Sequence, residues 1–182
     1  MKHTFRKITL AALVLCLGST ATFAQLKRFS IGPYLEVATP AGDFHDTHGT
    51  GYGGGINADI KLIAGLGVTG SVGFERFGGK TVTQSYTDPV SGNITTNSYK
   101  NPSINAIPIR VGLKYHFFPL LYVKAEGGVV NFVDSKYSSG AAAIFAPGIG
   151  IRVLMLDVEA KYEIWSHDGS NGFWGLKAGF NF

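Results

Sequence analysis

Apolar and polar residues alternate with a period of two along most of the chain after residue 25. Within residues 107–115, for example, Ile107, Ile109 and Val111 share one face, and Arg110 lies on the opposite face. Such alternation is typical of strands that bury one face, and helical spacing fits these segments less well. The pattern predicts eight strands, over about residues 29–38, 51–63, 66–78, 103–116, 121–132, 142–153, 156–166 and 173–182.

Eight such strands fit two all-β architectures. A soluble barrel or sandwich turns the apolar face inward, whereas a transmembrane barrel turns it toward lipid and encloses the polar face. The predicted connections differ in length: those around 64–65, 117–120 and 154–155 are tight, and those at 39–50, 79–102, 133–141 and 167–172 are longer. This segregation favours an eight-stranded antiparallel up-and-down transmembrane β-barrel with both termini at the short-turn end, which is the periplasmic end in an outer membrane.

Aromatic residues gather near the ends of the predicted strands. Aromatic rings prefer the membrane–water boundary, so this distribution predicts two aromatic girdles, one at each boundary. The alternative is that these aromatic residues pack in an ordinary core. The girdle at the short-turn end would contain Phe29, Tyr115, Phe117, Phe118, Tyr122, Phe180 and Phe182, and the girdle at the loop end Tyr52, Phe74, Phe77, Phe132, Trp165, Phe173 and Trp174.

Three prolines interrupt the strand pattern. Pro33, Pro108 and Pro147 fall inside predicted strands, although a closed barrel has no free edge where a missing N–H is harmless. They predict β-bulges or different strand limits at these positions.

The first 24 residues have the layout of a secretory signal peptide. Lys2, Arg6 and Lys7 precede the apolar run 8–17, and Ala24 ends a small-residue cleavage site. We therefore predict a signal peptide at 1–24 and a barrel domain at 25–182, with an N-terminal membrane anchor as the alternative. Without those three residues, the 16 bases of the chain become 13 against 12 acids, which excludes a globally basic nucleic-acid binder. The only cysteine, Cys16, lies in the same segment.

The two end strands carry a family resemblance. The last strand, with Trp174, Leu176, Phe180 and Phe182 on one face, resembles the C-terminal sorting strand of Gram-negative outer-membrane barrels. The opening strand and its turn, residues 31–44, are similar to those of small barrels of the OmpA, OmpX and opacity type. The resemblance implies a monomer in the outer membrane, in contact with its lipids and lipopolysaccharide and inserted by the barrel-assembly machinery.

The predicted lumen is charged and nearly balanced. An eight-stranded barrel has an interior just wide enough to be filled by side chains, and buried charges are costly unless they are paired. We therefore predict an ion-pair plug, with a narrow channel as the alternative. Its acids are Glu36, Asp59, Glu75, Glu126, Glu159 and Glu163, and its bases are Lys61, Arg110, Lys114, Lys124, Arg152, Lys161 and Lys177.

The longest connection, residues 79–102, alternates Thr, Val, Ser and Tyr around a turn at 88–92. This pattern predicts two strands that continue beyond the membrane as a hairpin, whose free edges could bind an external ligand by β-augmentation. Family members with such hairpins are associated with adhesion, and a merely solvated loop is the alternative. We expect a structural, surface-exposed protein that is not an enzyme and needs no cofactor.

Two chemical alternatives remain. Lipid A deacylases are also eight-stranded outer-membrane barrels, and their His-x-Ser-Asn motif resembles residues 167–171, although the spacing here is one residue longer. This resemblance implies a weak hydrolase alternative in which Glu163 orients His167 and Ser170 is the nucleophile. His45 and His48, with Asp43 and Asp46, form the other alternative, a zinc site in the first outer loop.

Overall fold

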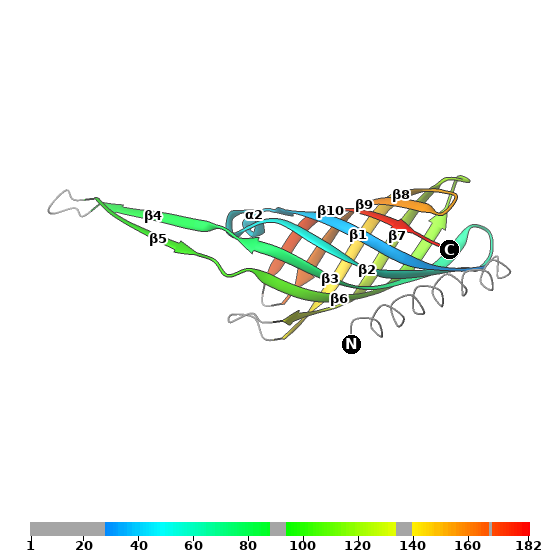
Figure 1. The fold of residues 1–182 in the computed structure, drawn as a ribbon, viewed down its shortest axis with the longest axis horizontal. Helices are drawn as coiled ribbons and strands as arrows, with labels where there is room; N and C mark the ends of the chain where they lie inside the picture. Colours follow the sequence, from blue (N-terminus) through cyan, green and yellow to red (C-terminus); the bar gives the residue numbers. More distant parts are fainter. Residues whose placement is uncertain (1–27, 88–93, 134–139, 168) are drawn as a thin grey trace, which may run out of the picture.

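The structure, a computed structural model, describes residues 28–87, 94–133, 140–167 and 169–182. The predicted signal peptide and the tip of the predicted hairpin lie outside the described residues. Eight antiparallel strands close into a barrel in the order β1-β10-β9-β8-β7-β6-β3-β2, which confirms the predicted fold (Figure 1). Their bounds are β1 Phe29–Ala41, β2 His48–Lys61, β3 Leu66–Gly79, β6 Ile104–His116, β7 Leu121–Val133, β8 Ala141–Val153, β9 Leu156–Ser166 and β10 Ser170–Phe180.

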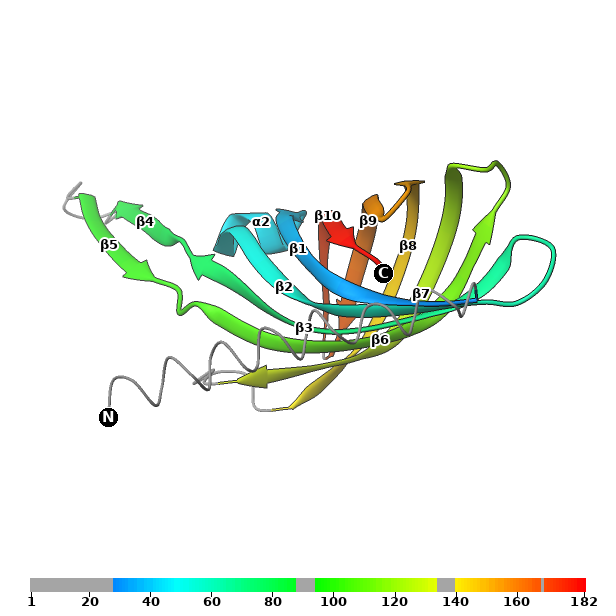
Figure 2. The same ribbon diagram turned by 45° about the vertical axis from the view of Figure 1, so that its right-hand side comes forward.

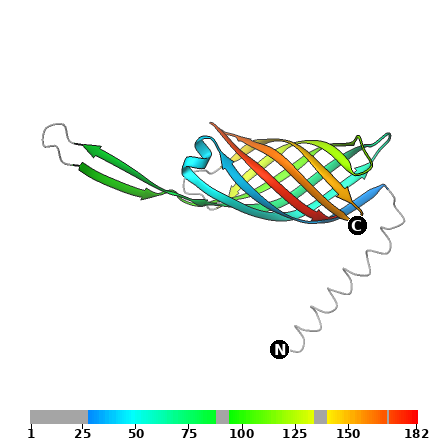
Figure 3. The same ribbon diagram turned by 90° about the horizontal axis from the view of Figure 1, so that it is seen from above.

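Two further strands project from one end of the barrel. β4 (Thr81–Thr87) and β5 (Ile94–Lys100) pair with each other in a separate two-stranded sheet. They prolong β3 and β6 far beyond the barrel wall (Figure 2), and the C-terminus lies at the opposite end (Figure 3). The hairpin predicted within 79–102 is therefore present, and we call the end that carries it the loop end.

A five-residue helix, α2 (Asp43–Thr47), lies in the connection between β1 and β2. The sequence pattern did not predict it. Phe44 is the buried residue of this helix. A helix of five residues with one buried side chain is too short to show a helical period in the sequence. No helix in the described ranges is long and apolar enough to cross a membrane.

The side chains point as they do in a barrel surrounded by lipid. Ile109 and Val111 are 47% and 60% exposed on the outer surface, and Ile151 is 44% exposed. Arg110 and Lys161, in contrast, are 2% and 1% exposed in the interior. Apolar residues outside and charged residues inside are the transmembrane arrangement, so the predicted orientation is confirmed.

The prolines do not form the predicted bulges. The pairing register is the same on either side of Pro33, Pro108 and Pro147, and each proline still pairs with one neighbouring strand. The missing N–H of each proline therefore interrupts the pairing with one neighbouring strand, but it does not shift the register of that strand. The register shift between β2 and β3 lies elsewhere, between His48 and Gly51 at the loop end.

The predicted girdles are partly wrong. Tyr52, Phe74 and Trp174 face outward at the loop end, as do Tyr115, Phe117, Phe118, Phe180 and Phe182 at the short-turn end. Phe77, Trp165, Phe173 and Tyr122 are instead fully buried in the lumen, and Phe132 is partly buried against Trp165. The reason is the strand period: Phe77 and Trp165 lie two residues after the inward-facing Glu75 and Glu163.

Candidate functional site

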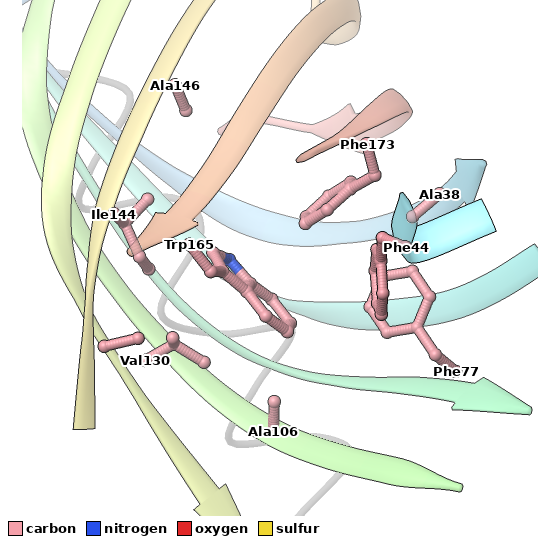
Figure 4. Packing of buried hydrophobic residues seen from close by; sticks show 10 residues of the cluster. Ala38, Phe44, Phe77, Ala106, Val130, Ile144, Ala146, Trp165 and Phe173 are labelled. Atoms are coloured by element: carbon pink, nitrogen blue, oxygen red, sulfur yellow. The ribbon is translucent and has the colours of Figure 1, made fainter. Parts of the chain in front are cut away.

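The loop end of the lumen is closed by an aromatic cluster. Trp165 lies edge-on to Phe77 and Phe173, with ring centroids 5.6 and 5.2 Å apart, and Phe44 of α2 packs 5.0 Å from Phe77 (Figure 4). The short helix thus delivers one ring into the barrel mouth, and β3, β9 and β10 supply the others. We call Phe44, Phe77, Trp165 and Phe173 the aromatic cap.

A charge network begins directly below the aromatic cap. The Arg110 guanidinium forms ion pairs with Glu75 and with Glu163, the latter at 2.8 Å. The Lys161 ammonium lies 2.7 Å from Glu163 and 2.8 Å from Glu36. Trp165 joins the two layers, because its indole Nε1 donates a hydrogen bond of 2.6 Å to Glu163.

A second group of charges lies around Lys124. Its ammonium is 3.1 Å from Glu126 and 2.5 Å from Glu159. Lys177 sits over the ring of Tyr34, with its ammonium 3.9 Å from the ring centroid. A cation over an aromatic face is attracted by the ring quadrupole, so Lys177 also has a favourable contact in the closed lumen.

The third group lies toward the short-turn end. The Lys114 ammonium is 3.0 Å from Asp59 and 3.1 Å from Asp157, and Arg152 pairs with both carboxylates. The Tyr122 hydroxyl donates a hydrogen bond to Asp157. Beyond this group the lumen opens into a cavity of about 420 Å³, bordered by Lys61 and by residues of the tight turns.

Two residues change the predicted lumen set. Lys61 is exposed at the end of β2, where it borders the open end of the lumen, so it is not part of the buried ion-pair plug. Asp157 was missed, although its position two residues before Glu159 places it on the inward face of β9. The other twelve predicted residues face the lumen. With Asp157 added, the described part of the lumen contains seven acids and six bases.

The projecting hairpin has two different faces. One face carries a ladder of hydroxyl groups, in which Thr83 lies 3.1 Å from Ser98 and Ser85 lies 3.3 Å from Thr96. The register places Val82 opposite Tyr99, Gln84 opposite Asn97 and Tyr86 opposite Thr95 on the alternate positions. Tyr86 is 65% exposed, so the hairpin presents large polar–aromatic side chains to its surroundings.

The residues of the hydrolase alternative lie in different environments. Glu163 is completely buried and its carboxylate is held by Arg110, Lys161 and Trp165. Ser170, in contrast, is exposed at the start of β10 and pairs with Ser166 across the turn. Because Glu163 is committed to the lumen network, the structure gives no support to its role in orienting His167 as a base.

The zinc alternative also receives no support. Both ring nitrogens of His48 are engaged, Nδ1 with the Thr47 hydroxyl at 2.9 Å and Nε2 with the Pro102 carbonyl at 3.2 Å. His45 is exposed on α2. Among the described residues, no group of three or more His, Cys, Asp or Glu side chains is placed to hold a metal ion.

Comparisons with known proteins agree with this architecture. No family model matches the chain, and no curated protein matches it. A de novo designed transmembrane β-barrel aligns with a TM-score of 0.51 and 14% identity, covering 84% of this chain and 95% of that chain. The Yersinia pestis outer membrane protein Ail, in a phospholipid bilayer nanodisc, aligns with a TM-score of 0.51 and 16% identity. The alignment covers 86% of this chain and 100% of the Ail chain.

This protein folds as a small outer-membrane-type β-barrel. The N-terminal β-barrel domain of Pseudomonas aeruginosa OprF is a more distant match, with a TM-score of 0.45 and 16% identity, covering 84% of this chain and 97% of that chain. The likeness extends over the whole described barrel, and what the protein does must be argued from its own side chains.

Proposed function

We propose that the protein is a non-enzymatic, surface-exposed barrel of the outer membrane that contributes to envelope integrity and contacts an external partner through the hairpin at 79–102. The projection of β4 and β5 beyond the barrel carries this proposal (Figure 3). The loop end then faces outward, both termini face the periplasm, and lipids and lipopolysaccharide surround a monomer. The aligned Ail barrel is itself an outer membrane protein, which supports the location.

The hairpin is suited to binding through its backbone. β4 and β5 pair with each other in register from Thr81–Lys100 to Thr87–Ile94 and join no other strand of the described residues. Each strand therefore keeps one edge whose N–H and C=O groups can pair with an extended segment of a partner, by β-augmentation. A rigid barrel holds this edge away from the membrane surface.

The closed lumen argues against the channel alternative. The aromatic cap and three groups of ion pairs follow one another along the barrel axis. A conducting pore needs a water-filled path lined by groups that bind ions weakly, whereas these charges are bound to each other. The arrangement instead braces the barrel wall from within, which fits a scaffold for the hairpin.

Removal of residues 80–100 tests the proposal. We expect bacteria that produce the shortened protein to bind immobilised host cells no better than bacteria without the protein, because the exposed edges of β4 and β5 are lost. The barrel itself should remain folded, as measured by heat-modifiable gel migration, since β4 and β5 form a separate sheet.

Single substitutions distinguish the binding mode. Tyr86→Ser should keep most of the binding if backbone edges dominate, and Thr83→Pro should lower it because proline removes an N–H. Tyr52→Ser is the matched control, because Tyr52 on the barrel wall is as exposed as Tyr86, at 65% each. Undiminished binding by a correctly folded deletion variant would refute the role of the hairpin.

A further inference from the structure

The tight turns at the short-turn end are entirely apolar. They read Leu62-Ile63-Ala64-Gly65, Phe117-Phe118-Pro119-Leu120 and Leu154-Met155, and none contains a polar side chain. We call these residues the turn ring. Ile63 is 75% exposed and Leu154 is 92% exposed. Turns in contact with water are usually built from Gly, Asn, Asp, Ser and Pro, so this composition needs a reason.

Leu154 makes the contrast sharper. Its φ angle is 56°, in the left-handed region where a Cβ atom is disfavoured and where a two-residue turn normally carries Asn, Asp or Gly. Ala64 has a φ of 51° in the first turn. In water, a large apolar side chain in this strained position would have no favourable contact. In contact with acyl chains, the same side chain is removed from water, and this transfer is favourable.

Three carbonyl groups of the turn ring accept hydrogen bonds from neighbouring parts of the barrel. The Gly65 carbonyl accepts a hydrogen bond of 2.9 Å from the His116 N–H, and the Leu120 carbonyl accepts one of 2.8 Å from the Arg152 N–H. The Met155 carbonyl accepts one of 2.8 Å from Asn181. The first two turns are thereby tied to the following hairpin, and the third turn is tied to the C-terminal segment after β10. Internal pairing of backbone groups is the condition for placing irregular backbone near hydrocarbon.

The turn ring continues the lipid-facing surface of the barrel. On β6 the outward residues from Ile107 to Phe117 are exposed and apolar. At about 3.4 Å per residue and a tilt of about 40°, they span roughly 26 Å along the barrel axis, which matches the height of the apolar band of such barrels. Phe118 and Leu120 extend this band further without a polar boundary.

From these observations we propose that the turn ring inserts into the lipid leaflet at the short-turn end, with phospholipid acyl chains as its partner. Lys61, which is exposed directly before the first turn, lies at the rim of the same end. A basic side chain beside an inserted apolar surface can extend to the level of the lipid phosphates. The turn ring, together with the lipid-facing wall, then sets how deeply the barrel sits in the bilayer.

Fluorophore labelling in phospholipid nanodiscs, where both faces of the bilayer meet solvent, tests this proposal. The chain from residue 25 onward has no cysteine, so Leu154→Cys or Ile63→Cys gives a single labelling site. We expect acyl-chain nitroxide lipids to quench both labels strongly and aqueous iodide to quench them several-fold less than a label at Thr83→Cys on β4. Using two sites guards against a folding defect caused by either substitution.

The opposite pattern would overturn the proposal. If iodide quenches the labels at positions 154 and 63 as strongly as the label at position 83, the turn ring lies in water and is free for a soluble partner. Heat-modifiable migration of each labelled protein controls for folding. The hairpin proposal is unaffected by either result, because β4 and β5 lie at the other end of the barrel.

Discussion

Replacing Arg110 with alanine is expected to lower the free energy of unfolding by about 3–5 kcal/mol, the cost of leaving buried charges without their partner. The guanidinium pairs with Glu75 and Glu163, and all three side chains are at most 1% exposed. Its loss would remove the base paired with Glu75 and leave Glu163 with Lys161 inside the closed lumen. Urea titration of protein folded in lipid vesicles, followed by heat-modifiable migration, measures the change.

Two variants separate the lost ion pairs from a general loss of packing. Lys61→Ala removes an exposed lysine at the rim of the lumen, outside the buried ion-pair network, and should change stability by less than about 0.5 kcal/mol. A triple variant, Arg110→Met with Glu75→Gln and Glu163→Gln, removes all three charges while keeping their volume. It should recover most of the loss, because no carboxylate of the three is left charged without its base and Lys161 keeps its ion pair with Glu36. Equal stability of Arg110→Ala and Lys61→Ala would contradict the network.

The second large effect is expected on the outer surface. Val111 is 60% exposed near the middle of the apolar band on β6. Val111→Arg should therefore lower the free energy of unfolding in a bilayer by about 2–4 kcal/mol, because it places a charge at the depth of the acyl chains. The same urea titration in lipid vesicles measures this loss.

A matched arginine at the edge of the band provides the control. Ile107 lies on the same face of β6, four residues nearer the loop end, and Ile107→Arg should cost about 0–1 kcal/mol. The native Arg76 supports this dependence on depth, because it faces outward and pairs with Tyr52 and Asn105 at the loop end. A loss as small at position 111 as at position 107 would mean that β6 does not present this face to lipid.

Strand positions and side-chain orientation could be predicted because both depend on a local period of two. Once Arg110 is placed inside, Ile109 and Val111 must lie outside, whatever the rest of the barrel does. The same rule would have placed Asp157, Phe77 and Trp165 inside. The sequence did not predict these positions, because the preference of aromatic rings for the membrane boundary competes with the strand period at strand ends and because Asp157 lies beside a turn.

The partners of the lumen charges could not be predicted in this way. Arg110 on β6 meets Glu163 on β9, 53 residues later, across the interior of the barrel. Such contacts depend on the stagger between strands and on the tilt that closes the barrel, and neither leaves a local signal in the sequence. α2 and its Phe44 were missed for a related reason, since one buried ring in five residues has no period.

The most direct test of the account is a spin-label scan of β6 in lipid bilayers, one position at a time from Ile107 to Leu113. Accessibility to oxygen, which concentrates among acyl chains, should be high at positions 107, 109, 111 and 113 and low at positions 108, 110 and 112. Immobile, inaccessible labels at the odd positions, with water-soluble relaxation agents reaching the even positions, would contradict the orientation from which the lumen, the hairpin scaffold and the turn ring are all derived.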